Sequence, residues 1–362
     1  MTTVYSYDLI GKKQSVVDEI LLLNPNQTPM LNLLGFGNPV ASTTHIWYED
    51  EMFATKATVT TAADAAATSL VVSDVEPFRP NVVAKVNEEM VFVTAVDPTT
   101  KTLTVTRAYA GSTAAAIAKN AVIEFLFVEG VEGFDARDAR SKPRTKVDNV
   151  TQIFDESVEL SGTSQSVAQY GIDDLYGYEK AKKELEVALQ LEKAVIDGLH
   201  YDSGRVRQMR GIRSFIQTNV TPVSGPITVD ILNGTAQKIY TAGGFRSGGK
   251  YAVVVPAKQK MAISGLTQDK IRITQAETTR GQVVDHLVND FGQFPIIMND
   301  NLQSDELFFI DTNRISIRPM AGREFSHELL AKTGDRLNGM VFGEYTLEFR
   351  QEKAHARVKG LQ

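Results

Sequence analysis

The stretch DDLYGYEKAKKELEVALQLEKAVIDGL, residues 173–199, carries the most regular pattern in the chain and decides its framework. Its apolar side chains recur every three or four residues, which predicts an amphipathic helix. At 1.5 Å per residue this helix is roughly 40 Å long. The apolar stripe consists of Leu175, Tyr178, Ala181, Leu185, Ala188, Leu189, Val195, Ile196 and Leu199. We therefore predict a scaffold helix rather than a ligand-binding element.

The ends and the polar side of this helix support the same prediction. Asp173 and Asp174 stand at the N-terminal end, where the helix dipole favours negative charge. The side opposite the stripe is expected to face solvent, and it carries Lys182, Lys183, Glu184, Glu186 and Glu192.

A mixed α/β unit is predicted downstream of the helix, over residues 211–345. A capped helix is expected at residues 228–242, a buried strand at 251–255 and a second helix at 257–266. Further strands are expected at residues 294–298, 307–310 and 315–317. Residues 344–359, EYTLEFRQEKAHARVK, alternate in character and predict one long C-terminal strand.

A separate small all-β unit is predicted upstream, over residues 58–128. Short β-rich runs at 82–86, 90–96, 103–107 and 122–128 are separated by turn residues. This spacing indicates a small barrel or sandwich.

The first 57 residues predict an extended arm followed by a strand. A short helix is expected at 12–23, and the segment NPNQTPMLNLLGFGNP at 24–39 contains prolines and glycines that are expected to interrupt regular structure. Its apolar residues are expected to lie on the chain's own body or on a neighbouring subunit. They are Met30, Leu31, Leu33, Leu34 and Phe36. Trp47, the only tryptophan, lies in the predicted strand at 41–57.

Composition limits the function classes. The 362 residues include no cysteine, which excludes disulfides, thiolate metal sites and a cysteine nucleophile. Neither a signal peptide nor a membrane-spanning segment is recognised, so we expect a soluble chain made in the cytoplasm. The net charge of −6 is uneven, because residues 129–200 carry −6 and residues 201–362 carry +5. This asymmetry suits head-to-tail contact between copies, although a mixed solvated surface has the same pattern.

No catalytic, cofactor-binding or metal-binding set is recognised in the sequence. Gly244–Lys250 has the spacing of a phosphate-binding loop, but Tyr251 stands where a hydroxyl residue is needed. A helix is also predicted before this loop and a strand after it, which reverses the order that phosphate binding requires. The five histidines lack metal-ligand spacing.

Four arginines follow the long helix within nine residues, at Arg205, Arg207, Arg210 and Arg213. Phosphate contact is one interpretation, but no nucleic-acid-binding module accompanies them. We predict a subunit contact or a salt-bridge patch facing acidic residues of 129–200.

Three stretches together resemble the major capsid proteins of tailed bacteriophages of the Hong Kong 97 type. They are VVDEILLLNPNQTPMLNLLG at 16–35, LEKAVIDGLHYDSGRVRQMRGIRSFI at 191–216, and the pair DTNRISIRPM at 311–320 and GEYTLEFRQEKAHARVKGL at 343–361. Their order and spacing, more than any single motif, make the resemblance.

The resemblance implies an α+β capsid fold with defined segments. Residues 1–40 correspond to an N-terminal arm, and 41–57 with 129–160 to the two limbs of an extended loop. Residues 161–210 and 341–362 correspond to a peripheral domain whose spine helix is 173–199, and 211–340 to an axial domain. Residues 58–128 are then a β-barrel or sandwich inserted into the extended loop, either projecting outward or clamping neighbouring capsomers.

The implied function is structural and not enzymatic, without cofactors. Copies would assemble as hexamers and pentamers into an icosahedral head that encloses double-stranded DNA, in the virion, after assembly in the host cytoplasm. Implied partners are a portal, scaffolding or decoration proteins and packaged DNA, with no membrane. Expected subunit-interface residues are the arm residues, Trp47 and the four arginines named above. Three alternatives stay open: a glycan-binding or adhesin-like protein, a nucleotide-dependent packaging component, and the shell of a cargo-enclosing nanocompartment.

Overall fold

The computed structural model divides the chain into two compact units. One is Tyr48–Thr145, here called the barrel unit, and the other combines the residues before and after it, here called the body. The structure describes residues 28–130, 132–133, 136–167, 174–247, 249–266, 272–277, 283–332 and 334–362. The short helix expected at 12–23 lies outside these residues.

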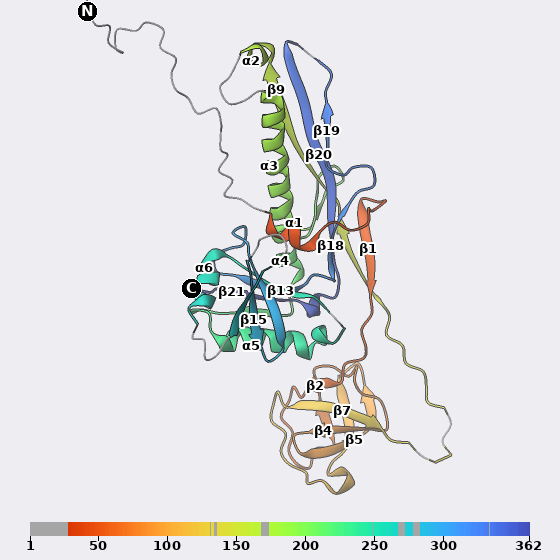
Figure 1. The fold of residues 1–362 in the computed structure, drawn as a ribbon. Helices are drawn as coiled ribbons and strands as arrows, with labels where there is room; N and C mark the ends of the chain where they lie inside the picture. The colour runs from red at the N-terminus through yellow and green to blue at the C-terminus, as the bar shows by residue number, and fades with distance from the viewer. Residues whose placement is uncertain are drawn as a thin grey trace, which may run out of the picture. The chain divides into compact units, whose positions relative to one another are not determined.

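A seven-stranded sheet forms the centre of the body, in the order β12-β21-β17-β13-β16-β15-β14 (Figure 1). Strand β13 is parallel to β16 and antiparallel to β17, so the sheet is mixed. The strands are β12 (Val220–Pro222), β13 (Tyr251–Val255), β14 (Arg272–Glu277), β15 (Val283–Asn289), β16 (Gly292–Met298), β17 (Leu307–Asp311) and β21 (Ala356–Lys359).

Each face of this sheet has its own hydrophobic core. Val253 and Val255 of β13 point into a core with residues of α5 (Val229–Thr241) and α6 (Ala257–Ser264). Val254, between them, points into a second core with residues of α3 (Leu175–Asp197) and α4 (Ile212–Phe215). Successive side chains of a strand face opposite sides, so β13 is buried on both faces, as its continuous apolar run predicts.

The long helix predicted at 173–199 is confirmed as α3. Asp174 caps its start, accepting a hydrogen bond from the Gly177 backbone N–H at 3.0 Å. The helix packs on a four-stranded sheet in which β20 (Arg336–Phe349) pairs antiparallel with β9 (Gln152–Ser161) along ten residues. β18 (Ile315–Pro319) and β19 (Ser326–Leu329) also pair with β20. Together these elements form the spine of the body.

The single C-terminal strand predicted at 344–359 is wrong. β20 begins at Arg336 and ends at Phe349, and β21 begins only at Ala356, in the seven-stranded sheet. Between them Gln351 adopts a left-handed conformation with φ 52°, and a 3-10 turn covers Glu352–Ala354. Residues 356–359, expected in the peripheral domain, therefore lie in the same sheet as strands of the expected axial segment 211–340. Strand β18, expected in the axial segment, pairs instead with β20. The sheets therefore do not follow the expected boundary at residue 340.

The small all-β unit predicted at 58–128 is present as a barrel. Its sheet order is β2-β7-β4-β5-β6-β3, and all pairs are antiparallel. An antiparallel bridge between Val59 and Val72 joins the two edges, so the sheet closes on itself. The strands are β2 (Lys56–Thr58), β3 (Ser69–Val71), β4 (Val82–Val86), β5 (Glu89–Asp97), β6 (Thr102–Thr106) and β7 (Val122–Val128).

The remaining described strands form two separate pairs. In the predicted strand at 41–57, β1 (Thr44–Glu49) pairs with β8 (Thr145–Val150), which places the two expected limbs side by side at that point. β10 (Tyr201–Asp202) and β11 (Arg207–Gln208) form a hairpin after α3, and α2 (Gly162–Ser166) follows β9. The helices expected at 228–242 and 257–266 are confirmed within two residues as α5 and α6.

Candidate assembly site at the arm root

The segment Thr28–Val40, here called the arm root, is attached to the body along its whole length. It begins with a six-residue helix, α1 (Pro29–Leu34), inside the stretch that was expected to lack regular structure. Proline is favoured at the first helical position, because its missing N–H has no helical partner there. The helix is too short to be stable alone, so its contacts with the body must hold it.

The principal contact is with Glu192 on α3, whose side chain is fully buried. Its carboxylate accepts the backbone N–H groups of Met30 and Leu31, each at 2.9 Å, and the Asn299 Nδ2–H at 2.6 Å. Burial raises the pKa of Glu192, and these three hydrogen bonds lower it only in part. The prediction that Glu192 faces solvent is wrong. The signal was present, because Val195 and Ile196 stand three and four residues further along the helix, on the apolar stripe.

The second half of the arm root adds an edge to the spine sheet. Phe36 and Val40 form parallel bridges with Ile317 and Met320, and the Gly37 N–H donates to the Ile317 carbonyl at 2.8 Å. A Cβ at Gly37 would collide with the Ser316 Oγ, so the serine hydroxyl would have to turn away. The arm root is thus fixed by a buried carboxylate at one end and by backbone pairing at the other.

The arm and strand residues expected at a subunit interface differ in their exposure. Met30, Leu31 and Trp47 are buried in the core around α3 and α4, so the interface prediction is wrong for them within this structure. Leu33 and Leu34 are partly buried against the same core. Phe36 is 56% exposed and remains available to a neighbour. The proposed contact with the chain's own body therefore holds for the first half of the arm root.

The four arginines after α3 do not form one shared surface. Arg207 pairs with Glu344 at 2.7 Å, and Arg213 pairs with Glu306 at 3.0 Å and Asp197 at 2.5 Å. These are ion pairs within one chain, and the subunit-contact interpretation of both arginines stays a prediction.

The other two arginines differ from each other. The Arg210 guanidinium lies over the Phe215 ring at 5.1 Å, and the Arg205 side chain is exposed on the β10–β11 hairpin. The predicted pairing with acidic residues of 129–200 is found for Arg213, which pairs with Asp197. Arg207 pairs instead with Glu344, outside that region.

Buried carboxylates on β20 connect the limbs to the spine. Glu344 accepts hydrogen bonds from Thr151 Oγ1 at 2.5 Å, Arg207 at 2.7 Å and Arg323 at 2.8 Å. Burial raises the pKa of Glu348, but a hydrogen bond from His45 and the charges of Arg318 and Arg350 outweigh it and hold the pKa at about 2. Sequence reasoning missed this network, because its partners lie far apart along the chain.

The barrel unit contains its own buried ion pair at one end. The guanidinium of Arg107 forms a two-pronged contact with Glu89, with both distances 2.7 Å. Its remaining N–H groups donate to the carbonyls of Asp64, Ala67 and Ala115, so all five donors are used. This pair fixes two loops of the barrel against β5.

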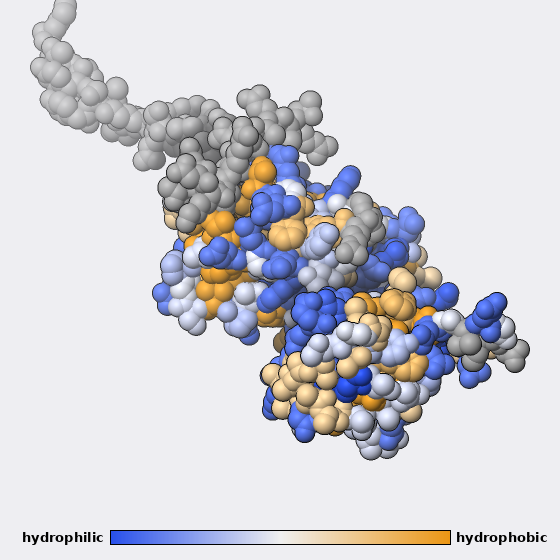
Figure 2. Space-filling model, turned by 90° about the horizontal axis from the view of Figure 1, so that it is seen from below, coloured by the Kyte–Doolittle hydropathy of each residue, from blue (hydrophilic) through white to orange (hydrophobic). Residues whose placement is uncertain are grey.

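Exposed apolar side chains lie elsewhere on the barrel unit. Figure 2 shows hydrophobic residues over much of the barrel's visible face. The large exposed apolar residues of the unit are Tyr48, Met52, Val122 and Phe127.

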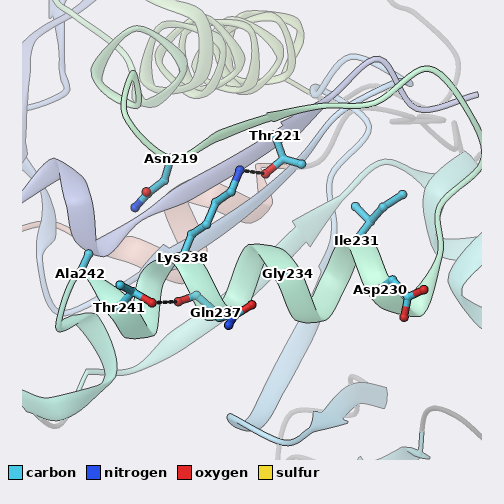
Figure 3. Close-up of a pocket in the computed structure, with 9 residues that line it drawn as sticks. All are labelled: Asn219, Thr221, Asp230, Ile231, Gly234, Gln237, Lys238, Thr241 and Ala242. Carbon is cyan, nitrogen blue, oxygen red and sulfur yellow. Dashed lines mark hydrogen bonds between the residues drawn. The ribbon is translucent and has the colours of Figure 1, made fainter. Parts of the chain in front are cut away.

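An open groove of about 590 Å³ lies between α5 and the segment leading into β12 (Figure 3). Lys238 donates to Thr221 Oγ1 at 2.9 Å, and the Asn219 amide donates to the carbonyls of Lys353 and His355. These polar groups are already engaged with one another or with the backbone.

A buried carboxylate lies beside the described residues of the loop at 244–247 and 249–250. The Lys250 N–H donates to the Asp311 carboxylate at 3.0 Å, and this carboxylate is buried beside the loop. A negative group here would repel phosphate rather than bind it. Among the described residues, no cluster of histidines and carboxylates is placed to hold a metal ion, and no helix is long and apolar enough to cross a membrane.

The family model of the SU10 major capsid protein matches residues 2–362. The chain belongs to this family. It is also similar to the major capsid protein of Escherichia phage Phieco32, with 38% identity over 68 residues. That alignment spans 19% of this chain and 19% of the relative, so it covers about a fifth of the relative's length.

Solved structures show the same fold at low sequence identity. The capsid asymmetric unit of cyanophage A-1(L) has a TM-score of 0.56 at 9% identity, with 98% of each chain covered. A structure from Mycobacterium phage Bobi has a TM-score of 0.51 at 11% identity, covering 96% of this chain and 95% of that one. An encapsulin from Synechococcus elongatus has a TM-score of 0.50 at 8% identity, covering 96% and 93%. The predicted α+β fold of the Hong Kong 97 type is confirmed.

Proposed function

We propose that this chain is the structural subunit of a tailed-phage head, assembling with copies of itself into a closed icosahedral shell around double-stranded DNA. The family match over residues 2–362 is the observation that carries the proposal, and the shared fold supports it. The role is structural, so no catalytic residue is assigned. A portal, scaffolding or decoration proteins and the packaged DNA are further proposed partners, with assembly in the host cytoplasm and the virion capsid as the final location.

In this proposal each segment has a mechanical task. Residues 1–40 form the arm, 41–57 and 129–160 the two limbs, 173–199 the spine helix and 211–340 most of the axial domain. The ion pairs of Glu344 and Glu348 keep the base of the limbs rigid against the spine. Rigid protomers lose less entropy on association, and many weak repeated contacts then add through multivalency.

The barrel unit is proposed to clamp neighbouring capsomers rather than to bind a small ligand. Exposed side chains such as Met52 and Phe127, 92% and 57% exposed, support a contact surface. A glycan-binding role is the competing interpretation, and a glycan array with the full chain distinguishes the two. Binding of a defined glycan would favour the adhesin-like alternative.

The test of the proposed function is expression of the full chain beside a variant lacking residues 1–27. This cut leaves α1 and its contact with Glu192 in place, so the body should still fold. We expect closed particles from the full chain by electron microscopy and none from the truncated chain. Closed particles of normal size from the truncated chain would contradict the proposed role of the arm.

A nanocompartment shell is the second candidate, because the encapsulin structure covers nearly the whole chain. Particles isolated with their native contents separate the two functions. Long double-stranded DNA inside the particles supports a phage head, whereas a protein cargo without DNA supports a nanocompartment.

A further inference from the structure

Six carboxylates are buried in the part of the chain that the structure describes. They are Glu89, Glu192, Glu306, Asp311, Glu344 and Glu348. Five of them form an ion pair with at least one arginine, as buried acids generally need. Glu192 differs, because its three recorded partners are neutral N–H groups: two backbone amides of the arm root and the Asn299 side chain.

Because Glu192 has no arginine partner among the described residues, backbone amides of the arm root help to stabilise its negative charge. The amides of Met30 and Leu31 supply two of the three hydrogen bonds that stabilise the Glu192 carboxylate. If α1 leaves, the carboxylate keeps only the bond from Asn299, in surroundings formed by the main core. A buried charge with too few donors is strongly unfavourable. Loss of either amide contact is therefore unfavourable, and docking of α1 on Glu192 is close to all-or-none.

The position of this contact determines where the residues before Thr28 leave the body. Met30 and Leu31 lie in the first turn of α1, two and three residues after Thr28, where the arm root begins. Fixing both amides on one carboxylate fixes the place and direction at which the chain enters the body. In a symmetric shell every copy makes the same contact with its neighbour. If the arm left the body at a different place in each copy, this repeated contact could not form.

We infer that Glu192 is a positioning residue for shell assembly: the carboxylate orients the arm through the amides of Met30 and Leu31, although Glu192 itself is buried. The inference rests on the proposed function and names the residue that sets the orientation of the arm. It also explains why a glutamate rather than an apolar residue occupies this place in the core, where a charge without a cation is otherwise a disadvantage.

The decisive variant is Glu192→Gln, which keeps the shape but replaces one acceptor oxygen by a donor NH₂ group that faces another N–H. The matched control is Glu184→Gln, the same change on the exposed part of α3. Hydrogen exchange of the α1 segment is measured in unassembled protein, with assembly yield measured well below the unfolding temperature. For Glu192→Gln we expect exchange at least about tenfold faster, as loss of a hydrogen bond to a charged group predicts. We also expect a severalfold loss of closed particles, with neither change in the control.

Several outcomes overturn the inference. Unchanged α1 exchange in Glu192→Gln would show that the carboxylate does not hold the arm root. Normal particles from a Glu192→Gln chain with faster exchange would show a merely structural role. If Glu192→Gln does not fold, Asn299→Ala decides, because it removes one of the three hydrogen bonds to Glu192 and leaves both amide contacts. We then expect α1 exchange intermediate between the wild type and a detached arm, and wild-type exchange would contradict the inference. If the wild-type chain forms no particles, the proposed function fails, while the exchange comparison still decides the role of Glu192.

Discussion

The Glu348→Gln substitution tests whether the buried charges on β20 stabilise the body. Glu348 is almost fully buried and lies 3.0 Å from His45 Nε2, with Arg318 and Arg350 also in contact. Its pKa is about 2 in the folded chain against an ordinary 4.5. At about 1.4 kcal/mol for each tenfold change in the ionisation equilibrium, the ionised carboxylate contributes about 3 kcal/mol near neutral pH.

The sign of the pH dependence follows from the lowered pKa. The contribution is complete above the unfolded-state pKa of 4.5 and is lost as pH falls toward the folded-state pKa of about 2. Glu348→Gln should therefore lower the free energy of unfolding by about 3 kcal/mol at pH 7, and by less than half of that, about 1.4 kcal/mol, at pH 3. Below pH 2 the two proteins should converge.

Urea unfolding followed by tryptophan fluorescence is the appropriate assay, because Trp47 is the only tryptophan and is buried in the body core. Glu328→Gln, an exposed acid on β19, is the control and should change stability by less than about 0.5 kcal/mol at every pH. A stability loss in Glu348→Gln that is the same at pH 7 and pH 3 would refute the reasoning, because it would come from packing and not from charge.

Three further substitutions test other parts of the account. Gly37→Ala should loosen the second half of the arm root, because its Cβ forces the Ser316 Oγ to turn away, and faster protease cleavage near Gly37 should report it. Arg107→Lys should destabilise the barrel by about 2 kcal/mol through loss of the two-pronged contact. Circular dichroism should show this, whereas a matching change in Trp47 fluorescence would contradict the separate barrel unit. Leu191→Ala should lower stability by about 2–5 kcal/mol, because Leu191 is fully buried; a loss below about 1 kcal/mol would contradict the packing of α3 against the sheets.

Elements with strong local signals could be predicted from the sequence. The apolar stripe of α3, the continuous apolar run of β13 and the alternating strands of the barrel each follow from periodicity within a few residues. The break after Phe349 could not, because the alternation continues through Gln351 and only the pairing of β21 in a different sheet reveals two strands. Local pattern identifies an element, but it does not assign that element to a sheet.

The arm root shows the same limit more sharply. Pro29 and the glycines of 24–39 favour irregular structure locally, yet α1 forms because Glu192, more than 160 residues away, accepts its first amides. The partners of Arg207 and Arg213 are likewise distant, with Glu344 137 residues from Arg207. Contacts across such separations depend on tertiary structure. The sequence therefore indicated which apolar and arginine side chains need a partner, but not whether that partner lies on a neighbouring copy or in the same chain.

Cryo-electron microscopy of particles formed by the full chain tests the central claim most directly. The account predicts closed shells in which each copy has α1 docked on Glu192 and the residues before Thr28 lie on a neighbouring copy. A chain that stays monomeric under all assembly conditions would contradict it, and so would shells in which residues 1–27 fold back on their own body.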